Sequence, residues 1–289
     1  PASWKDLFDS AGTATTGGSE IFRQRIPEHD ALTLSRATRA GMICLGKTNL
    51  SEFAFSGLGI NPTFGTPVNP FDSATPRCPG GSSSGSAVSV AKGLAPITVG
   101  TDTGGSIRQP ASFTGIVGLK PTYGRCSRWG VVAFASSLDQ AGPLTKSAED
   151  AALMLNAIAG LDEKDSTSID TPTDDYTAGL NNSLEGLKIG IPRQHFAEGL
   201  NSEVEQSIRD ALKEYEKLGA TIKEIDLPNN HLSVSAYYVV APAEASANLS
   251  RFDGVRYGYR CEDPVDLEDM YKRSRSEGFG DEVKRRILV

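Results

Sequence analysis

The sequence predicts an α/β fold, because segments with helix and strand patterns alternate along its 289 residues. Two observations carry this prediction. Short apolar runs stop at glycine or proline as strands do, and segments with apolar residues three or four positions apart are bounded by helix-capping signals. Between residues 187 and 227, a strand, a helix and a second strand follow one another within about forty residues, which indicates a parallel crossover.

The first expected helix covers residues 31–40, where Leu32 and Leu34 alternate with polar and basic side chains. Gly41 separates this segment from the apolar run 42–45. We expect a helix that leads into a buried strand.

Residues 80–106 contain seven glycines and six serines, and apolar side chains lie among them. A flexible linker would lack those apolar residues. We therefore expect a tight loop at 80–85, a helix at about 86–92, a buried strand at 95–100 and a second tight loop at 101–106. Both loops would present hydroxyls beside bare backbone amides.

A further helix is expected at 147–159, where Ser147 and Asp150 form a capping signal and Gly160 follows. Its side chains available for burial are Leu153, Leu155 and Ile158. The polar composition of residues 161–185 predicts an exposed connection.

The crossover begins with a strand at 187–191, which Pro192 ends. A helix starts at Ser202, whose capping box closes on Glu205, and a second strand covers 221–227. The helix ends at Gly219 and places apolar residues on one face, namely Val204, Ile208, Leu212 and Tyr215. We expect a single domain over 1–289, with a catalytic core at about 1–160 and a peripheral lobe at about 186–289.

Composition excludes several classes of function. The chain carries 29 Lys and Arg against 36 Asp and Glu, a net charge of −7, so a basic nucleic-acid groove is not its main feature. Its four cysteines form no C-x-x-C pair and its three histidines are scattered, which favours a reducing compartment and gives no support to a metal site. No apolar stretch is long enough to span a membrane and no signal segment opens the chain, so we expect a cytoplasmic protein.

The first glycine-serine loop has three interpretations. As a phosphate-binding loop, Gly80-x-x-x-x-Gly85-Ser86 has serine where lysine is required. As a nucleophile elbow, residues 81–85 satisfy G-x-S-x-G with Ser83 at the apex, but no convincing strand precedes them. As a plain turn, the loop would leave the second loop without an explanation.

A site formed by both loops together explains their composition better than either loop alone. Residues 101–106 (TDTGGS) offer successive backbone N–H groups, two of them on glycines, as an oxyanion hole requires. Ser106 at the end of this loop would be the nucleophile. With no histidine nearby, its base would be a carboxylate or a buried lysine, since burial lowers the pKa of an ammonium group.

Three segments resemble the amidase signature family: KDLFD at 5–9, PGGSSSGSA at 79–87 and GTDTGGSIRQP at 100–110. The serines at 82 and 106 also have the spacing of that family, 24 positions. The resemblance implies a central mixed sheet flanked by helices. It implies no cofactor in this chain.

Carried over to this sequence, the resemblance makes Ser106 the acyl nucleophile, Ser82 a relay serine next to an unusual cis peptide, and Lys5 the base. The oxyanion hole would be formed by the backbone amides of Thr103, Gly104, Gly105 and Ser106. Asp102 and Arg108 would hold the loops more than they touch substrate, and they count only as tentative members of the substrate pocket. The other tentative pocket residues are Phe55, Ser56 and Gly57.

Segments after about residue 117 resemble the A subunits of tRNA-dependent glutamyl (aspartyl) amidotransferases, and the longest lie at 118–125, 133–143 and 237–258. Such a protein hydrolyses glutamine and sends ammonia to a B subunit, which activates the misacylated tRNA with ATP and Mg²⁺. The implied enzyme is a carbon–nitrogen ligase of protein biosynthesis. The implied partners are the B subunit, a small C subunit, and indirectly the tRNA.

The front part departs from this pattern. Residues 48–62 resemble stand-alone amidases, and apolar Phe55 and Leu58 would line the acyl pocket. A stand-alone amidase that acts on small aryl or alkyl amides is therefore an alternative, and so is a truncated, inactive assembly subunit. Compared with the family, the chain is expected to lack a front segment and the tail that grips the backbone groups of glutamine.

Overall fold

The computed structural model describes residues 1–72 and 74–289. The chain forms two compact units. The larger unit contains Pro1–Thr177 and Val240–Val289, and the smaller contains Ala178–Val239.

The larger unit is built on a five-stranded mixed sheet with the order β2-β1-β3-β5-β4. The first strand runs parallel to its two neighbours, and the pairs β3–β5 and β4–β5 are antiparallel. The predicted α/β class with a mixed central sheet is confirmed. The strands are β1 (Ala2–Lys5), β2 (Cys44–Thr48), β3 (Ile97–Asp102), β4 (Val117–Gly118) and β5 (Gln140–Thr145).

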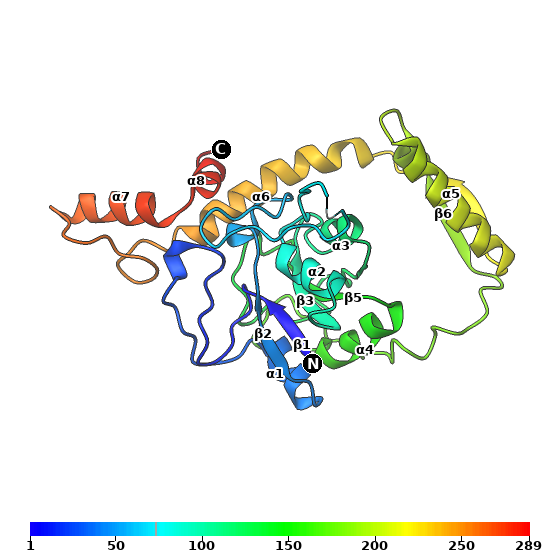
Figure 1. Ribbon diagram of the computed structural model, residues 1–289, viewed down its shortest axis with the longest axis horizontal. Helices are drawn as coiled ribbons and strands as arrows, with labels where there is room; N and C mark the ends of the chain where they lie inside the picture. The colour runs from blue at the N-terminus through cyan, green and yellow to red at the C-terminus, as the bar shows by residue number, and fades with distance from the viewer. Residues whose placement is uncertain (73) are drawn as a thin grey trace. The chain divides into compact units, whose positions relative to one another are not determined.

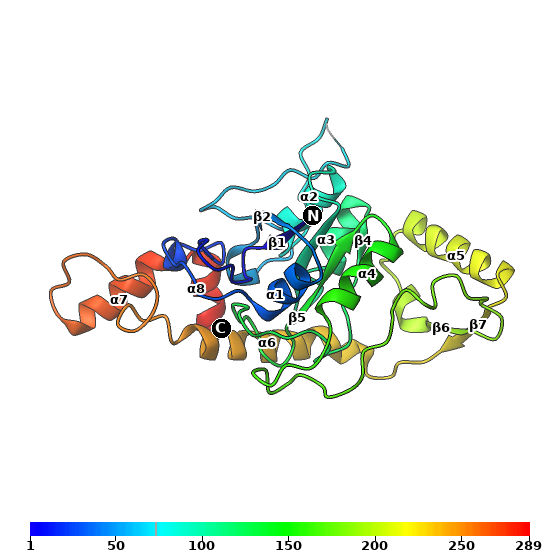
Figure 2. The ribbon, with the colours of Figure 1, turned by 90° about the horizontal axis from the view of Figure 1, so that it is seen from below.

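Helices cover both faces of this sheet (Figures 1 and 2). On one face, α1 (Leu32–Arg39) packs with α4 (Ala148–Ile158) over a core that includes Trp4 and Val99. On the other, α2 (Ser84–Ala91) and α3 (Arg108–Thr114) pack against the strands. Because side chains alternate along a strand, Trp4 and Lys5 point to opposite faces, and Lys5 faces α2.

The glycine-serine region follows the predicted order of loop, helix, strand and loop. The helix begins at Ser84 rather than at about 86, and the strand covers Ile97–Asp102 rather than 95–100. The helix is short and almost wholly buried, since it lies across four strands of the sheet.

The expected strand at 42–45 was placed too early and is not buried. The observed strand, β2, covers Cys44–Thr48 at the edge of the sheet, where it pairs with β1 on one side. Ile43 and Leu45 are therefore exposed.

The helix expected at 147–159 is confirmed as α4, and Ser147 caps it by accepting a hydrogen bond from the Asp150 N–H (3.1 Å). Leu155 and Ile158 are buried as expected, whereas Leu153 is exposed. The connection at 161–185 is mostly exposed, with Asp162 and Asp165 buried as anchors.

The smaller unit contains the predicted parallel crossover. Strands β6 (Lys188–Pro192) and β7 (Thr221–Ile225) pair in parallel, and α5 (Ser202–Lys217) connects them. The helix starts at Ser202 as expected, but its cap was predicted wrongly: Asn201, not Ser202, accepts hydrogen bonds from the first backbone N–H groups (2.8 and 3.2 Å), because Ser202 already lies inside the helix and asparagine is a strong cap. No residue of α5 is buried, although its apolar side chains share one face.

The last part of the chain contains α6 (Ser233–Leu249), α7 (Leu267–Gly278) and α8 (Asp281–Leu288). From Val240 onward it belongs to the larger unit, so the predicted peripheral lobe at 186–289 covers more of the chain than the smaller unit does. The reason is packing: Ala241, Ala245, Leu249, Met270 and Val283 are buried there. Short 3-10 turns lie at Glu20–Phe22, Glu52–Ala54, Arg193–Phe196 and Asn230–Leu232.

None of the helices formed by residues 1–72 and 74–289 has both the length and the apolar character that crossing a membrane requires.

Candidate active site

Lys5 is the last residue of β1 and its side chain is completely buried. Its ammonium nitrogen Nζ donates to Ser82 Oγ and to Thr101 Oγ1, both at 2.7 Å. These hydroxyls come from the loop before α2 and from β3, so the lysine joins both segments that the sequence singled out. Thr101 is a site residue that the sequence analysis did not identify as a partner of Lys5.

Burial lowers the pKa of Lys5 from about 10.5 to about 7, while the nearby carboxylates of Asp102 and Asp139 oppose this shift. Desolvation disfavours the charged ammonium form because no water surrounds it. A lysine with this pKa is partly neutral at pH 7, so its nitrogen can accept a proton.

Ser82 is buried, and the peptide bond between Gly81 and Ser82 is cis, as the resemblance implied. The loop is held closely: a Cβ on Gly81 would lie 2.5 Å from the backbone nitrogen of Gly59 and 2.6 Å from the carbonyl oxygen of Ser56. Ser82 O in turn accepts a hydrogen bond from Ser51 N (3.2 Å). Only glycine fits at position 81, since backbone atoms occupy the space of a side chain.

Ser106 lies in the loop after β3 and is half-buried. A hydrogen bond from Ser83 N to Ser106 O (3.2 Å) joins its backbone to the first loop. The structure therefore brings Lys5, Ser82 and Ser106 into one neighbourhood, although they are far apart in the sequence.

Asp102 holds the second loop together. Its buried carboxylate accepts hydrogen bonds from the backbone N–H groups of Gly105 (2.8 Å) and Ile107 (3.2 Å), and from the guanidinium of Arg108 (2.9 and 3.0 Å). Although its burial acts in the opposite direction, these donors keep the pKa of Asp102 below its ordinary value. Asp102 is thus a loop-holding residue, and its complete burial removes it from the tentative substrate pocket.

The predicted oxyanion hole needs one correction. The N–H of Gly105 donates to Asp102, so this amide is directed at a carboxylate of the protein. Thr103, Gly104 and Ser106 remain as the proposed donors. Gly105 has a φ of +118°, which allows the loop to turn there.

The tentative pocket residues separate into two groups. Phe55 is only 2% exposed, and its ring packs against Phe134, with ring centres 4.5 Å apart, so it belongs to the core because apolar rings surround it. Ser56 and Gly57 lie next to the first glycine-serine loop: Ser56 O faces Gly81, and the Gln109 amide donates to Gly57 O (2.7 Å). The Arg108 side chain is 54% exposed and could still meet a substrate.

The two competing interpretations of the first loop do not fit the structure. A phosphate-binding loop needs free amides, but Ser83 N donates to Ser106 O and Gly85 N to Asn49 O (2.9 Å). A nucleophile elbow needs an accessible hydroxyl at Ser83, yet this side chain is buried and donates to Thr101 O (3.1 Å). In the part of the chain that the structure describes, no three His, Cys, Asp or Glu side chains form a group that could hold a metal ion.

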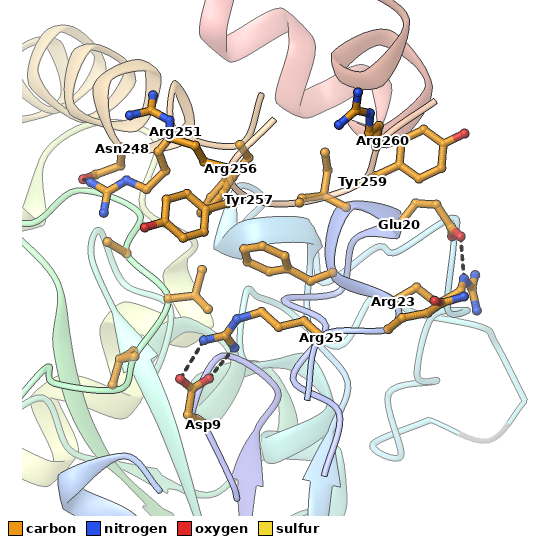
Figure 3. Close-up of a pocket in the computed structure, with 18 of the residues that line it drawn as sticks. Asp9, Glu20, Arg23, Arg25, Asn248, Arg251, Arg256, Tyr257, Tyr259 and Arg260 are labelled. Carbon is orange, nitrogen blue, oxygen red and sulfur yellow. Dashed lines mark hydrogen bonds and ion pairs between the residues drawn. The ribbon is translucent and has the colours of Figure 1, made fainter. Parts of the chain in front are cut away.

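A large cavity of about 980 Å³ lies elsewhere in the larger unit, and neither Lys5, Ser82 nor Ser106 lines it (Figure 3). Its walls come from residues 20–25, 130–133 and 248–262. Two of its arginines are paired with carboxylates, Arg25 with Asp9 and Arg23 with Glu20.

Buried Lys5, its contact with Ser82 and the glycine-rich loop agree with a match to the family model described as Amidase, which covers residues 1–289. The chain belongs to the amidase family. Its relatives include the A subunits of glutamyl-tRNA(Gln) amidotransferase from Marinobacter nauticus and from Marinomonas sp., each 59% identical over the whole chain. The amidase chain spans about 60% of the length of these relatives.

Solved amidase structures confirm the fold. The A subunit of glutamyl-tRNA(Gln) amidotransferase from Thermotoga maritima is 39% identical, with a TM-score of 0.82 over all of this chain and 57% of its own. The native peptide amidase of Stenotrophomonas maltophilia is 35% identical, with a TM-score of 0.83 over all of this chain and 61% of its own. The fold is thus shared by both kinds of enzyme, and the higher sequence identity lies with the amidotransferase subunits.

Proposed function

We propose that this chain hydrolyses an amide through Lys5, Ser82 and Ser106, and that its substrate is glutamine. The observation that carries the hydrolytic proposal is the buried Lys5, whose nitrogen contacts two hydroxyls and, among the described residues, forms no ion pair with a carboxylate at hydrogen-bonding distance. A surface lysine would remain charged and could not accept a proton at neutral pH.

In the proposed reaction, neutral Lys5 accepts the proton of Ser82 across the 2.7 Å contact, and Ser82 accepts the proton of Ser106. The Ser106 oxygen attacks the amide carbonyl and forms a tetrahedral intermediate. The same two groups then return a proton to the leaving nitrogen, so ammonia departs and an acyl-enzyme remains. Water hydrolyses the acyl-enzyme with Lys5 again acting as the base.

The negative oxygen of the intermediate would be stabilised by the backbone amides of Thr103, Gly104 and Ser106. Asp102 and Arg108 support this arrangement, since they fix the loop before any charge develops. Preorganised donors of this kind contribute roughly 3–4 kcal/mol each to transition-state stabilisation.

Glutamine is proposed as the substrate because the relatives with 59% identity are named as A subunits of glutamyl-tRNA(Gln) amidotransferase. On this proposal, the ammonia passes to a B subunit, with the help of a small C subunit, for the amidation of misacylated Glu-tRNA(Gln) or Asp-tRNA(Asn). ATP and Mg²⁺ would be used by that complex and not by this chain.

A stand-alone amidase is the second candidate, and the similarity to a peptide amidase favours it. An acyl pocket lined by apolar Phe55 and Leu58 is the sequence feature that supports this candidate. Phe55 packs in the core, whereas Leu58 is 51% exposed, so of the two only Leu58 is free to line such a pocket.

The proposed function is tested by ammonia release from glutamine and from simple aryl and alkyl amides, each with and without the B and C subunits of a related enzyme. We expect glutamine hydrolysis, increased by the partner subunits, and none in Ser106→Ala. Hydrolysis of the simple amides alone would establish the stand-alone candidate instead. An absence of hydrolysis together with stable binding of the partner subunits would establish an assembly subunit.

A further inference from the structure

Asp139 is a buried carboxyl group that the proposed mechanism does not use. It immediately precedes β5, whose first residue, Gln140, pairs with Asp102 at the end of β3. Because the two strands are antiparallel, Asp139 lies next to the point where the oxyanion loop leaves β3.

The Asp139 carboxylate accepts three hydrogen bonds. The Thr103 hydroxyl donates to Oδ1 at 2.6 Å, and the backbone N–H groups of Phe134 and Ala135 donate to Oδ2 and Oδ1 at 2.9 and 3.1 Å. Burial raises the pKa of Asp139, while these donors and the charge of Arg128 favour its ionised form. A group that accepts from three donors in fixed positions has little freedom to move.

These contacts connect the oxyanion loop with the segment that contains Phe134. Thr103 is the first proposed oxyanion donor, and Phe134 packs its ring on Phe55, which precedes Ser56 and Gly57 beside the catalytic loop. Asp102 holds the far part of the oxyanion loop through Gly105 and Ile107, whereas the Thr103 side chain is held by Asp139.

We propose that Asp139 is a positioning residue that fixes Thr103, so that the first part of the oxyanion loop is held by one carboxylate and the far part by another. This inference rests on the proposed function, because a fixed oxyanion loop matters only for an acyl-transfer reaction. We expect loss of this contact to lower kcat and to leave KM nearly unchanged, since the loop would stabilise the transition state more than the bound substrate.

The experiment compares Thr103→Val, which removes the hydroxyl but keeps the backbone N–H, with Asp139→Asn and the double variant. We expect each single variant to lower kcat by about ten- to a hundredfold with KM changed less than about threefold, and the double variant to be no slower than the slower single variant. Thr103→Ser, which restores the hydroxyl, should recover most of the kcat lost in Thr103→Val.

Thr114→Val is the matched control, because it also removes a threonine hydroxyl that donates a hydrogen bond, here to Pro110 O (2.7 Å) away from the loop. It should leave kcat unchanged. An equal kcat loss in this control, an unchanged kcat in Thr103→Val or multiplying losses in the double variant would overturn the proposal.

Hydrogen exchange of the loop amides gives a readout that needs no activity. We expect the peptide containing Gly104 and Gly105 to exchange at least about tenfold faster in Thr103→Val than in the unchanged protein, with equal melting temperatures. If the unchanged protein releases no ammonia, the proposed function fails while exchange still decides the role of Asp139. Unchanged exchange would overturn that role.

Discussion

The titration of Lys5 gives the sharpest test of the chemistry, because its pKa of about 7 lies far from the ordinary value of 10.5. If the neutral amine is the base, kcat/KM should follow the fraction of neutral Lys5. That fraction is about one half at pH 7, and it falls about tenfold for each pH unit below 6. We therefore expect kcat/KM to be about tenfold higher at pH 8 than at pH 6, and to change little from pH 8 to pH 9.

The lowered pKa of Lys5 also predicts that stability depends on pH, which can be measured without substrate. The pKa of Lys5 is lower in the folded than in the unfolded chain, so the unfolded chain binds more protons between pH 7 and 10.5, and stability rises with pH in this window. Integration from pH 7 to pH 9 gives a gain of about 2 kcal/mol in the free energy of unfolding.

The assay measures ammonia release and urea denaturation at several pH values for the unchanged protein, Lys5→Met and Lys92→Met. Lys5→Met should be inactive and should lose the gain of about 2 kcal/mol between pH 7 and pH 9, whereas Lys92→Met, at an exposed lysine, should resemble the unchanged protein. A kcat/KM that keeps rising tenfold per unit above pH 8, or a gain in stability that persists in Lys5→Met, would refute the assignment of Lys5 as a neutral base.

Three further predictions concern the supports of the site. In urea denaturation, Asp102→Ala should destabilise the fold by about 3 kcal/mol and Arg108→Ala by less. The reason is that Asp102 is fully buried, whereas the Arg108 side chain is 54% exposed. Equal losses of stability in the two variants would contradict this prediction. Asp165→Asn should cost about 3 kcal/mol at pH 7. Asp165 forms an ion pair with Arg128 (2.7 Å), and this donor keeps the pKa of Asp165 well below its usual range. The cost should therefore shrink as the pH falls below about 4, and a cost independent of pH would be evidence against this ion pair. Gly81→Ala should abolish activity and lower stability by about 2 kcal/mol in thermal melts, because the new Cβ would lie 2.5 Å from a backbone nitrogen. The control Gly179→Ala, whose new Cβ would have its nearest atom at 3.9 Å, should leave stability unchanged. Unchanged stability in Gly81→Ala would show that the loop can move aside.

The candidate catalytic residues could be predicted from the sequence because their motifs are local. The glycines and serines at 80–106 define two loops by themselves, and the resemblance then named Lys5, Ser82 and Ser106. The contact between Lys5 and Ser82 could not be derived from spacing, since 77 positions separate them. It depends on β1 pairing beside β3, which only the folded sheet shows.

The failures have a common physical origin in tertiary packing. The run at 42–45 looked buried because it is apolar, yet its strand lies at an edge of the sheet. Phe55 looked like a pocket residue because of its place in the motif, yet neighbouring rings enclose it. The role of Asp139 could not be predicted from the sequence, because its partner Thr103 is 36 positions away and no sequence pattern marks such a pair.

In the proposed mechanism Ser106 is the nucleophile, and Lys5 activates it through Ser82. The most direct measurement is to treat the protein with a serine-reactive sulfonyl fluoride and to locate the adduct by mass spectrometry of its peptides. We expect one adduct, on Ser106, formed at least about a hundredfold more slowly in Lys5→Met. An adduct on Ser83 in place of Ser106, or an equal rate in Lys5→Met, would contradict it.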